Sequence, residues 1–272
     1  MMTKEPQGSE TDMTAGKVAD VLLHADRLTL RNGGTPLLTD FNWQVRAGEF
    51  WCVLGKNGIG KSTLLHAVAG LLPPAGGRIC SPDGDIAAST PQQLARWRGL
   101  VAQQQFDAFS CSVIDYVMAG LHPYRPGWGW PDEADRQAAL VALDRLGMAS
   151  YADADVTQLS GGERQRIAIA TLMLPAPQLY LLDEPASHQD VAAQQMLLRL
   201  LRVLADDKHA VVASMHDINL AARFATHVIL IGSQRWWRGA VDDVLQPELL
   251  QAAFGCSFNV IASEQGKWFS PF

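Results

Sequence analysis

Long hydrophobic runs are missing from this sequence of 272 residues. No uninterrupted apolar stretch reaches the roughly 18 residues that a membrane-spanning helix requires. The charge-free segment 167–182 is shorter than that and contains Pro175 and Pro177, so it predicts a helix, a turn and a buried strand. We therefore expect no membrane-spanning helix in this chain.

Positive charge is in deficit. Lys and Arg together number 22 against 28 Asp and Glu, which gives a formal net charge of −6. A protein that coats nucleic acid needs a dominant field of Lys and Arg to displace counterions from the phosphates. The composition therefore argues against a nucleic-acid partner.

Cysteine is also scarce. The 4 cysteines lie far apart and form no CxxC pair, so they predict small core residues in a reducing compartment, not a zinc site or a disulfide framework. Residues 1–17 are polar and lack the apolar stretch of a secretory signal. We expect them to form a flexible tail on a soluble cytoplasmic protein.

Short apolar runs alternate with helical patterns along most of the chain, which is typical of an α/β protein with a mostly parallel sheet. Two alternating segments, 21–30 and 37–45, flank Asn32-Gly33-Gly34 and predict an antiparallel pair at the edge of the sheet. Further strands are expected at 50–54, 179–182, 210–214 and 228–231, and helices at 61–71, 191–205 and 218–224.

The middle of the chain, residues 112–173, has helical patterns and no strand signals. Within it, residues 132–146 predict a helix with an acidic first turn, an apolar face and Gly147 at its end. The region therefore predicts a helical insert. Because no internal repeat is visible, we expect a single copy of the domain.

A glycine-rich loop lies between the strand predicted at 50–54 and the helix that follows. Its sequence, Gly55-Lys56-Asn57-Gly58-Ile59-Gly60-Lys61-Ser62, matches the phosphate-loop pattern GxxxxGKS. Glycines let backbone N–H groups point at an anion, and the helix N-terminus adds partial positive charge. In such a loop Lys61 reaches the β- and γ-phosphates of a nucleotide, and Ser62 ligates Mg²⁺. The alternative is a glycine-rich turn with a surface lysine.

Two carboxylates follow the strand predicted at 179–182. In open α/β sheets ligands bind beyond the carboxyl ends of the strands, so Asp183 and Glu184 should emerge beside the phosphate loop. Asp183 suits a role in organising Mg²⁺, and Glu184 suits a general base that polarises an attacking water. The alternative is a strand that ends in solvated acids before Pro185.

A third motif is Leu159-Ser160-Gly161-Gly162-Glu163-Arg164-Gln165-Arg166. Ser160 and Glu163 predict a capping box, and a helix that begins with two glycines exposes its N–H groups to an anion. Together with the two motifs above, the string LSGGERQR resembles the signature of the ATP-binding-cassette (ABC) ATPases. The resemblance extends over nearly the whole chain after the tail.

The resemblance implies the P-loop NTPase fold of that family, with a mostly parallel core sheet, an antiparallel β edge and a helical subdomain insert. It assigns residues 18–272 to one ABC ATPase domain, with the insert at about 104–173 and a C-terminal extension at about 240–272. It also implies that ATP and Mg²⁺ are bound.

In that family two copies pair head to tail, and each ATP lies between the phosphate loop of one copy and the signature of the other. By resemblance, Ser160 and Gly162 would contact the γ-phosphate held by Lys61 of the second copy, and Asp190 would lie in the loop that crosses the dimer interface. The implied nucleotide-binding set is Gly55, Lys56, Asn57, Gly58, Ile59, Gly60, Lys61, Ser62, Thr63, Ser160, Gly161, Gly162, Glu163 and Asp190.

The resemblance implies catalytic roles for Glu184, His216, Gln103 and Asp183 and makes Ser62, Gln103 and Asp183 the Mg²⁺ ligands. His216 would bind the γ-phosphate and orient Glu184. Gln103 would sense Mg²⁺ and water; it is the first of three adjacent glutamines, which leaves its register open by one.

Two positions depart from the family pattern. Gln189 stands where the interface loop usually has Leu, which predicts weaker interface packing. Asn32 stands where the family commonly has an aromatic residue that stacks on adenine. We therefore expect modest ATP affinity or a substitute stacking residue.

The chain resembles the separate ATPase subunit of a bacterial importer. Residues 216–223 (HDINLAAR) and the segment 243–269 are similar to those in ATPases of importers for iron-siderophores, haem and cobalamin. The resemblance implies a peripheral position on the cytoplasmic side of the inner membrane, two integral membrane permease subunits and, indirectly, a substrate-binding protein. The alternatives are an exporter ATPase, a soluble non-transport ABC ATPase and a nucleotide-binding regulator, and the cargo stays open.

The Pro/Gly-rich loop 122–131 holds Tyr124, Trp128 and Trp130. Exposed aromatic residues there would form a contact surface, which the resemblance places toward the membrane subunits. The alternative is that they pack within the insert's own small core.

Overall fold

The computed structural model describes residues 20–32, 34–103, 109–125, 131–187, 189–233, 235–263 and 266–272, and only the backbone of Asn32 and Ser263. The expected tail, Trp128 and Trp130 lie outside the described residues. Within the described ranges, no helix combines the length and the apolar character needed to cross a membrane.

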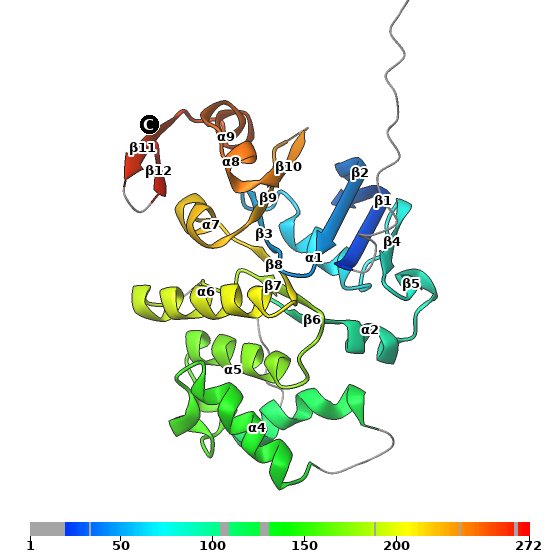
Figure 1. Ribbon diagram of the computed structural model, residues 1–272, viewed down its shortest axis with the longest axis vertical. Coiled ribbons are helices and arrows are strands. Elements are labelled where there is room, and N and C mark those ends of the chain that lie inside the picture. Colours follow the sequence, from blue (N-terminus) through cyan, green and yellow to red (C-terminus); the bar gives the residue numbers. More distant parts are fainter. Residues whose placement is uncertain are drawn as a thin grey trace, which may run out of the picture.

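A six-stranded sheet forms the centre of the molecule (Figure 1). Its order is β10-β9-β3-β8-β7-β6, and all neighbouring strands run parallel except β10 and β9. The predicted α/β fold with a mostly parallel core sheet is confirmed. The strands span Phe50–Gly55 (β3), Arg98–Val101 (β6), Leu179–Asp183 (β7), Ala210–Ser214 (β8), His227–Ile231 (β9) and Trp236–Ala240 (β10).

The first two strands, Val21–Asn32 (β1) and Thr35–Arg46 (β2), pair antiparallel as predicted. They lie not at the edge of the central sheet but in a separate four-stranded sheet of order β2-β1-β4-β5. Strand Gly76–Ser81 (β4) pairs with β1, and Gly84–Asp85 (β5) pairs with β4. Because β4 and β5 are short and rich in glycine, they lack the apolar alternation by which a strand can be predicted.

Each face of the central sheet borders its own hydrophobic core. Along β3 the side chains alternate, so that Phe50, Cys52 and Leu54 lie in one core and Trp51 and Val53 lie in the other. The first core includes residues of Gly161–Met173 (α5), Val191–Asp206 (α6) and Ile218–Phe224 (α7). The second includes Lys61–Val68 (α1), Pro91–Trp97 (α2) and the antiparallel sheet.

Helix α1 is shorter than the sequence predicted. It ends at Val68 because Gly70, two residues later, adopts a left-handed φ of 74° that a continuing helix cannot accommodate. Its first residue is Lys61, so the predicted phosphate loop connects β3 directly to the helix N-terminus.

Helices dominate the described residues between 112 and 173, as the sequence predicted. Helix Glu133–Asp144 (α4) begins with a capping box between Asp132 and Asp135, and the apolar face of the predicted helix is buried at Leu143 and Leu146. This region also holds Val113–Met118 (α3) and the 3₁₀ helices Ala119–Tyr124, Ala149–Tyr151 and Val156–Gln158, while another 3₁₀ helix, Ile86–Ala88, precedes α2.

The chain ends in a small unit beside α7, coloured orange to red in Figure 1. Helices Val241–Val244 (α8) and Pro247–Phe254 (α9) are followed by Phe258–Ser263 (β11) and Gly266–Pro271 (β12), which form an antiparallel hairpin. Strand β12 packs against α7. The hairpin therefore lies close to the segment that leads from β8 into α7.

Candidate active site

The phosphate loop adopts a conformation that depends on its glycines. Gly55, Gly58 and Gly60 have φ values of 155°, 72° and 110°. A β-carbon on Gly55 would lie 2.7 Å from the Ile231 carbonyl oxygen, and one on Gly60 would lie 2.5 Å from a Leu37 methyl group. No side chain caps the first turn of α1, so its N–H groups are available to an anion.

Lys61 is buried, and only 5% of the residue is exposed. Its Nζ donates to the carbonyl oxygens of Gly55 (3.2 Å) and Lys56 (3.4 Å) and lies 3.4 Å from His216 Nδ1. Burial lowers the pKa of Lys61, while the charges of Glu184 and Asp183 act in the opposite direction. Backbone carbonyl groups of the phosphate loop thus hold the Lys61 ammonium inside the loop.

Glu184 stands immediately after β7 in a left-handed conformation with a φ of 53°. Ser214, the last residue of β8 and fully buried, holds this corner in place. Its hydroxyl donates to Asp183 Oδ1 (2.5 Å) and accepts from the Glu184 backbone N–H (2.9 Å). One side chain therefore fixes both carboxylate residues relative to the neighbouring strand.

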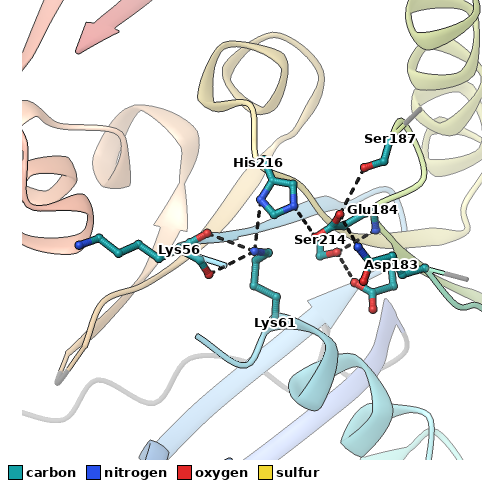
Figure 2. A network of polar contacts seen from close by, with 9 residues as sticks. Lys56, Lys61, Asp183, Glu184, Ser187, Ser214 and His216 are labelled. Atoms are coloured by element: carbon teal, nitrogen blue, oxygen red, sulfur yellow. Dashed lines mark hydrogen bonds and ion pairs between the residues drawn. The ribbon is translucent and has the colours of Figure 1, made fainter. Parts of the chain in front are cut away.

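The Glu184 carboxylate is the centre of a polar network (Figure 2). Gln103 Nε2 donates to Oε2 at 2.8 Å, Ser187 Oγ donates to the same oxygen at 3.3 Å, and His216 Nε2 contacts Oε1. Because an ammonium can only donate, His216 Nδ1 must accept from Lys61 and Nε2 must carry the hydrogen toward Glu184. The ring therefore links the lysine to the carboxylate.

A cavity of about 700 Å³ opens beside this network. It is lined by residues of the phosphate loop and α1 on one side and by Gln103, Glu184, Ser187 and His216 on the other. The lining residues from the phosphate loop and α1 are Asn57, Gly58, Gly60, Lys61, Ser62 and Thr63. The structure thus brings together groups that are far apart in sequence, since Lys61 and His216 are separated by 155 in residue number.

The oxygen donors at the cavity suit Mg²⁺. Ser62 and Gln103 line the cavity, and Asp183 lies beside Glu184 with a buried carboxylate. Within the part of the chain that the structure describes, no group of three or more His, Cys, Asp or Glu side chains could hold a metal ion by itself. Mg²⁺ commonly takes only one or two carboxylates and completes its shell with substrate phosphates and water, so this donor set fits it.

The signature residues lie apart from this cavity. Ser160 caps α5 in a reciprocal capping box with Glu163, whose carboxylate accepts from the Ser160 hydroxyl at 2.7 Å. These hydrogen bonds lower the pKa of Glu163. Ser160 and Gly161 are exposed, and a β-carbon on Gly161 would meet open space. None of Ser160, Gly161, Gly162 and Glu163 lines the cavity, so within one chain the structure does not bring them to Lys61.

Asp190 also stands away from the cavity. It caps α6, where its carboxylate accepts from the Ala193 backbone N–H at 2.8 Å. Gln189, which precedes it, donates from its side chain to the Pro185 carbonyl oxygen at 3.0 Å. Both residues therefore have a local structural role in the single chain, and their interface role stays a prediction.

Two site residues were missed by sequence reasoning. Ser187 reaches Glu184 from the loop after β7, and Ser214 bridges the two carboxylate residues. The only signal for Ser214 was one polar residue at the end of the apolar run 210–214. Of the three adjacent glutamines, Gln103 contacts Glu184, whereas Gln104, Gln105 and the Asn32 side chain lie outside the described residues.

Comparisons with known proteins all find similarity to ABC transporters and their ATP-binding proteins. Residues 38–187 match the family described as ABC transporter. The chain is 37% identical over 250 residues to the hemin import ATP-binding protein HmuV of Bordetella pertussis, covering 88% of this chain and 94% of that protein. It is 38% identical over 231 residues to the cobalamin import ATP-binding protein BtuD of Halobacterium salinarum, covering 84% of this chain but only 57% of that longer protein.

Solved structures show the same likeness. An inward-facing transporter described as metal-chelate type has a TM-score of 0.81 and 30% identity, covering 93% of this chain and 98% of that one. The cbiO1 protein of Clostridium perfringens, part of the cbiONQ transporter complex, has a TM-score of 0.72 and 28% identity, covering 85% of this chain and 93% of that one.

Proposed function

Since this chain belongs to the ABC transporter family as an ATP-binding, ATP-hydrolysing subunit, we propose that it drives the import of a metal chelate. The relatives described above import cobalamin or hemin, and one structural neighbour is of the metal-chelate type. These names support a cargo class of cobalamin, haem or an iron-siderophore. An exporter would share the same ATPase chemistry, and transport assays with the cognate permease separate the two.

The observation that carries the catalytic proposal is the Glu184 network beside the phosphate loop. The N–H groups of α1 and the Lys61 ammonium would bind the β- and γ-phosphates of ATP. Glu184, held by Gln103 and His216, would accept a proton from the attacking water. His216 would turn from Lys61 to the γ-phosphate when ATP enters.

Mg²⁺ would be held by Ser62, Gln103 and Asp183 together with phosphate oxygens, and when bound it would neutralise charge on the β- and γ-phosphates. The buried Ser214 hydroxyl fixes Asp183 for that role, since its hydrogen bond restricts the carboxylate to one orientation.

We propose that two copies close head to tail on two ATP molecules. In the single chain Ser160, Gly161 and Gly162 lie outside the cavity, so the exposed N-terminus of α5 does not face a phosphate held by this chain's own Lys61. A nucleotide held by the phosphate loop of a second copy would face it. The closing dimer would move two permease subunits at the cytoplasmic face of the inner membrane, with a substrate-binding protein delivering the cargo.

Replacement of the proposed base tests this function. Glu184→Gln keeps the size and hydrogen bonds of the side chain but removes its basicity, so kcat for ATP hydrolysis should fall about 100-fold or more. The same variant should accumulate as an ATP-bound dimer in size-exclusion chromatography. Glu248→Gln, an exposed acid at the start of α9, is the matched control and should change kcat by less than about twofold. Normal hydrolysis by Glu184→Gln would show that the base is another group.

A further inference from the structure

The C-terminal hairpin is tied to α7 through one side chain, Asn219. Its amide Nδ2 donates to the Phe269 carbonyl oxygen at 3.1 Å, and its Oδ1 accepts from the Phe269 backbone N–H at 2.7 Å. The side chain thus pairs with both backbone groups of one residue of β12, as a neighbouring strand would. The Phe269 side chain is itself buried, with 3% of the residue exposed, and packs in the first hydrophobic core, which includes residues of α5, α6 and α7.

This joint lies three residues from His216. Asp217, directly after His216, caps α7, and its carboxylate accepts from the backbone N–H groups of Asn219 (2.7 Å) and Leu220 (3.0 Å). Asn219 therefore contributes its backbone to the cap and its side chain to the hairpin. Any displacement of the first turn of α7 is carried to His216 through this cap.

Packing confines the His216 ring only in part, because 41% of its side chain is exposed. Its position therefore depends on its contacts with Lys61 and Glu184 and on its backbone. On the N-terminal side, Met215 is fixed by a hydrogen bond from its N–H to the Val53 carbonyl oxygen of β3 at 3.1 Å. On the C-terminal side, the first turn of α7 supplies the constraint. The backbone at His216 is therefore held by the central sheet on one side and by α7, which contacts the hairpin, on the other.

Apart from the packing of Phe269, the hairpin borders open space on one side. A hollow of about 440 Å³ lies beneath it, bordered by Phe269 and Lys267 on one side and by Ala222, Ala225 and Val241 on the other. Lys267 forms an ion pair with Asp242 at 2.7 Å, but both side chains are well exposed and such pairs contribute little to stability. The Asn219 pair is thus a half-buried polar link between the hairpin and α7.

The C-terminal segment also reaches the phosphate loop. A β-carbon on Gly255, the residue after α9, would lie 3.4 Å from Lys56 Nζ. Figure 2 shows the Lys56 side chain extending away from Lys61 and out of the polar network. An ammonium beside the C-terminal end of a helix is electrostatically favourable. The C-terminal segment therefore approaches the phosphate loop at Gly255 and contacts α7 at Asn219.

We infer that Asn219 is a positioning residue for the hydrolysis reaction: by pairing with Phe269 it uses the C-terminal hairpin to hold His216 against Glu184. The inference rests on the role proposed above for His216. It assigns the hairpin, which contributes no residue to the cavity lining, a part in the catalytic rate.

The test compares Asn219→Ala with Lys267→Ala, a control that alters the same hairpin but leaves the Asn219 pair intact. Asn219→Ala should lower kcat about tenfold, because a small misplacement of a catalytic group is costly. The ATP Kd should change by less than about twofold, since the phosphate loop is untouched. Lys267→Ala should leave kcat within about twofold of the parent. A parental kcat for Asn219→Ala would overturn the inference.

A double-mutant cycle separates positioning from general destabilisation. In a His216→Ala background, Asn219→Ala should cause no further loss of kcat, because its effect passes through His216. A further tenfold loss in that background would overturn the inference. If Asn219→Ala fails to fold, Asn219→Asp replaces it in both measurements, because the carboxylate keeps the acceptor for the Phe269 N–H. Parental hydrolysis by His216→Ala itself would instead contradict the proposed role of His216.

Discussion

At the scale of single residues, the most informative one is Glu184. Its left-handed backbone conformation is costly for a residue with a β-carbon, and such conformations persist where the surroundings enforce them. Here the enforcing group is Ser214, whose hydroxyl serves two neighbouring residues at once. The geometry of the base is therefore set from the adjacent strand.

Ser214→Ala should lower both stability and activity. The substitution leaves the buried Asp183 carboxylate without a donor and the Glu184 N–H without an acceptor, which should cost about 1–3 kcal/mol of unfolding free energy. Displacement of Glu184 should lower kcat about tenfold. Urea unfolding and steady-state ATPase assays measure the two effects. Ser89→Ala, away from the cavity, should change neither, and unchanged activity in Ser214→Ala would show that Glu184 keeps its position without the bridge.

Asn32 carries a separate prediction about the nucleotide base. An aromatic ring at this position should stack on adenine, so Asn32→Tyr should tighten ATP binding by about 1 kcal/mol, or about fivefold in Kd. Equilibrium binding of ATP to the two proteins measures the gain. Asn32→Gln, which adds size without a ring, is the control, and equal Kd values for all three proteins would place the base elsewhere.

At the scale of secondary structure, three helices begin in the same way. Reciprocal capping boxes start α2 at Thr90, α4 at Asp132 and α5 at Ser160. Local physics alone thus does not distinguish the signature helix from the other two, and only the surrounding string LSGGERQR does. This is why the role of Ser160 followed from a resemblance and not from its cap.

Ser160→Ala and Thr90→Ala form a matched pair. Each removes one N-cap hydroxyl and should cost about 1 kcal/mol of stability. Only Ser160→Ala should also weaken ATP-dependent dimerisation, because its hydroxyl faces the second copy in the proposed dimer. Thermal unfolding and analytical ultracentrifugation with ATP provide the two measurements. Equal dimerisation by both variants would contradict the proposed contact.

Elements with strong local patterns were predicted from the sequence, and those defined by distant partners were not. The alternating or wholly apolar strands β1, β2, β3, β7 and β8 were identified, as were α4, α6 and α7. Strand β4 exists because β1 offers it an edge, and that partner lies about 50 residues away in the chain. Strand β5 pairs in turn with β4. The hydrogen bonds from Ser214 to Asp183 and Glu184 could not be predicted for the same reason, since these partners lie about 30 residues away in the chain.

At the scale of the whole molecule, the cavity is a product of sheet order. Strands β3, β7 and β8 are adjacent and parallel, so the segments that follow them meet at one edge. The topological rule predicted that Asp183 and Glu184 would emerge near the phosphate loop. It did not predict which polar atoms would touch, because side-chain contacts depend on rotamers and neighbours that no linear pattern contains.

The contact between Lys61 and His216 directly links two residues that line the cavity. A hydrogen bond of 3.4 Å between Lys61 Nζ and His216 Nδ1 joins the glycine loop to the segment after β8. A nucleotide that ends at the β-phosphate would leave His216 without its proposed phosphate partner, so the bond to Lys61 could stay in place. A γ-phosphate that draws His216 toward it would break that bond. The site would thereby distinguish ADP from ATP by whether the hydrogen bond between Lys61 and His216 is intact or broken.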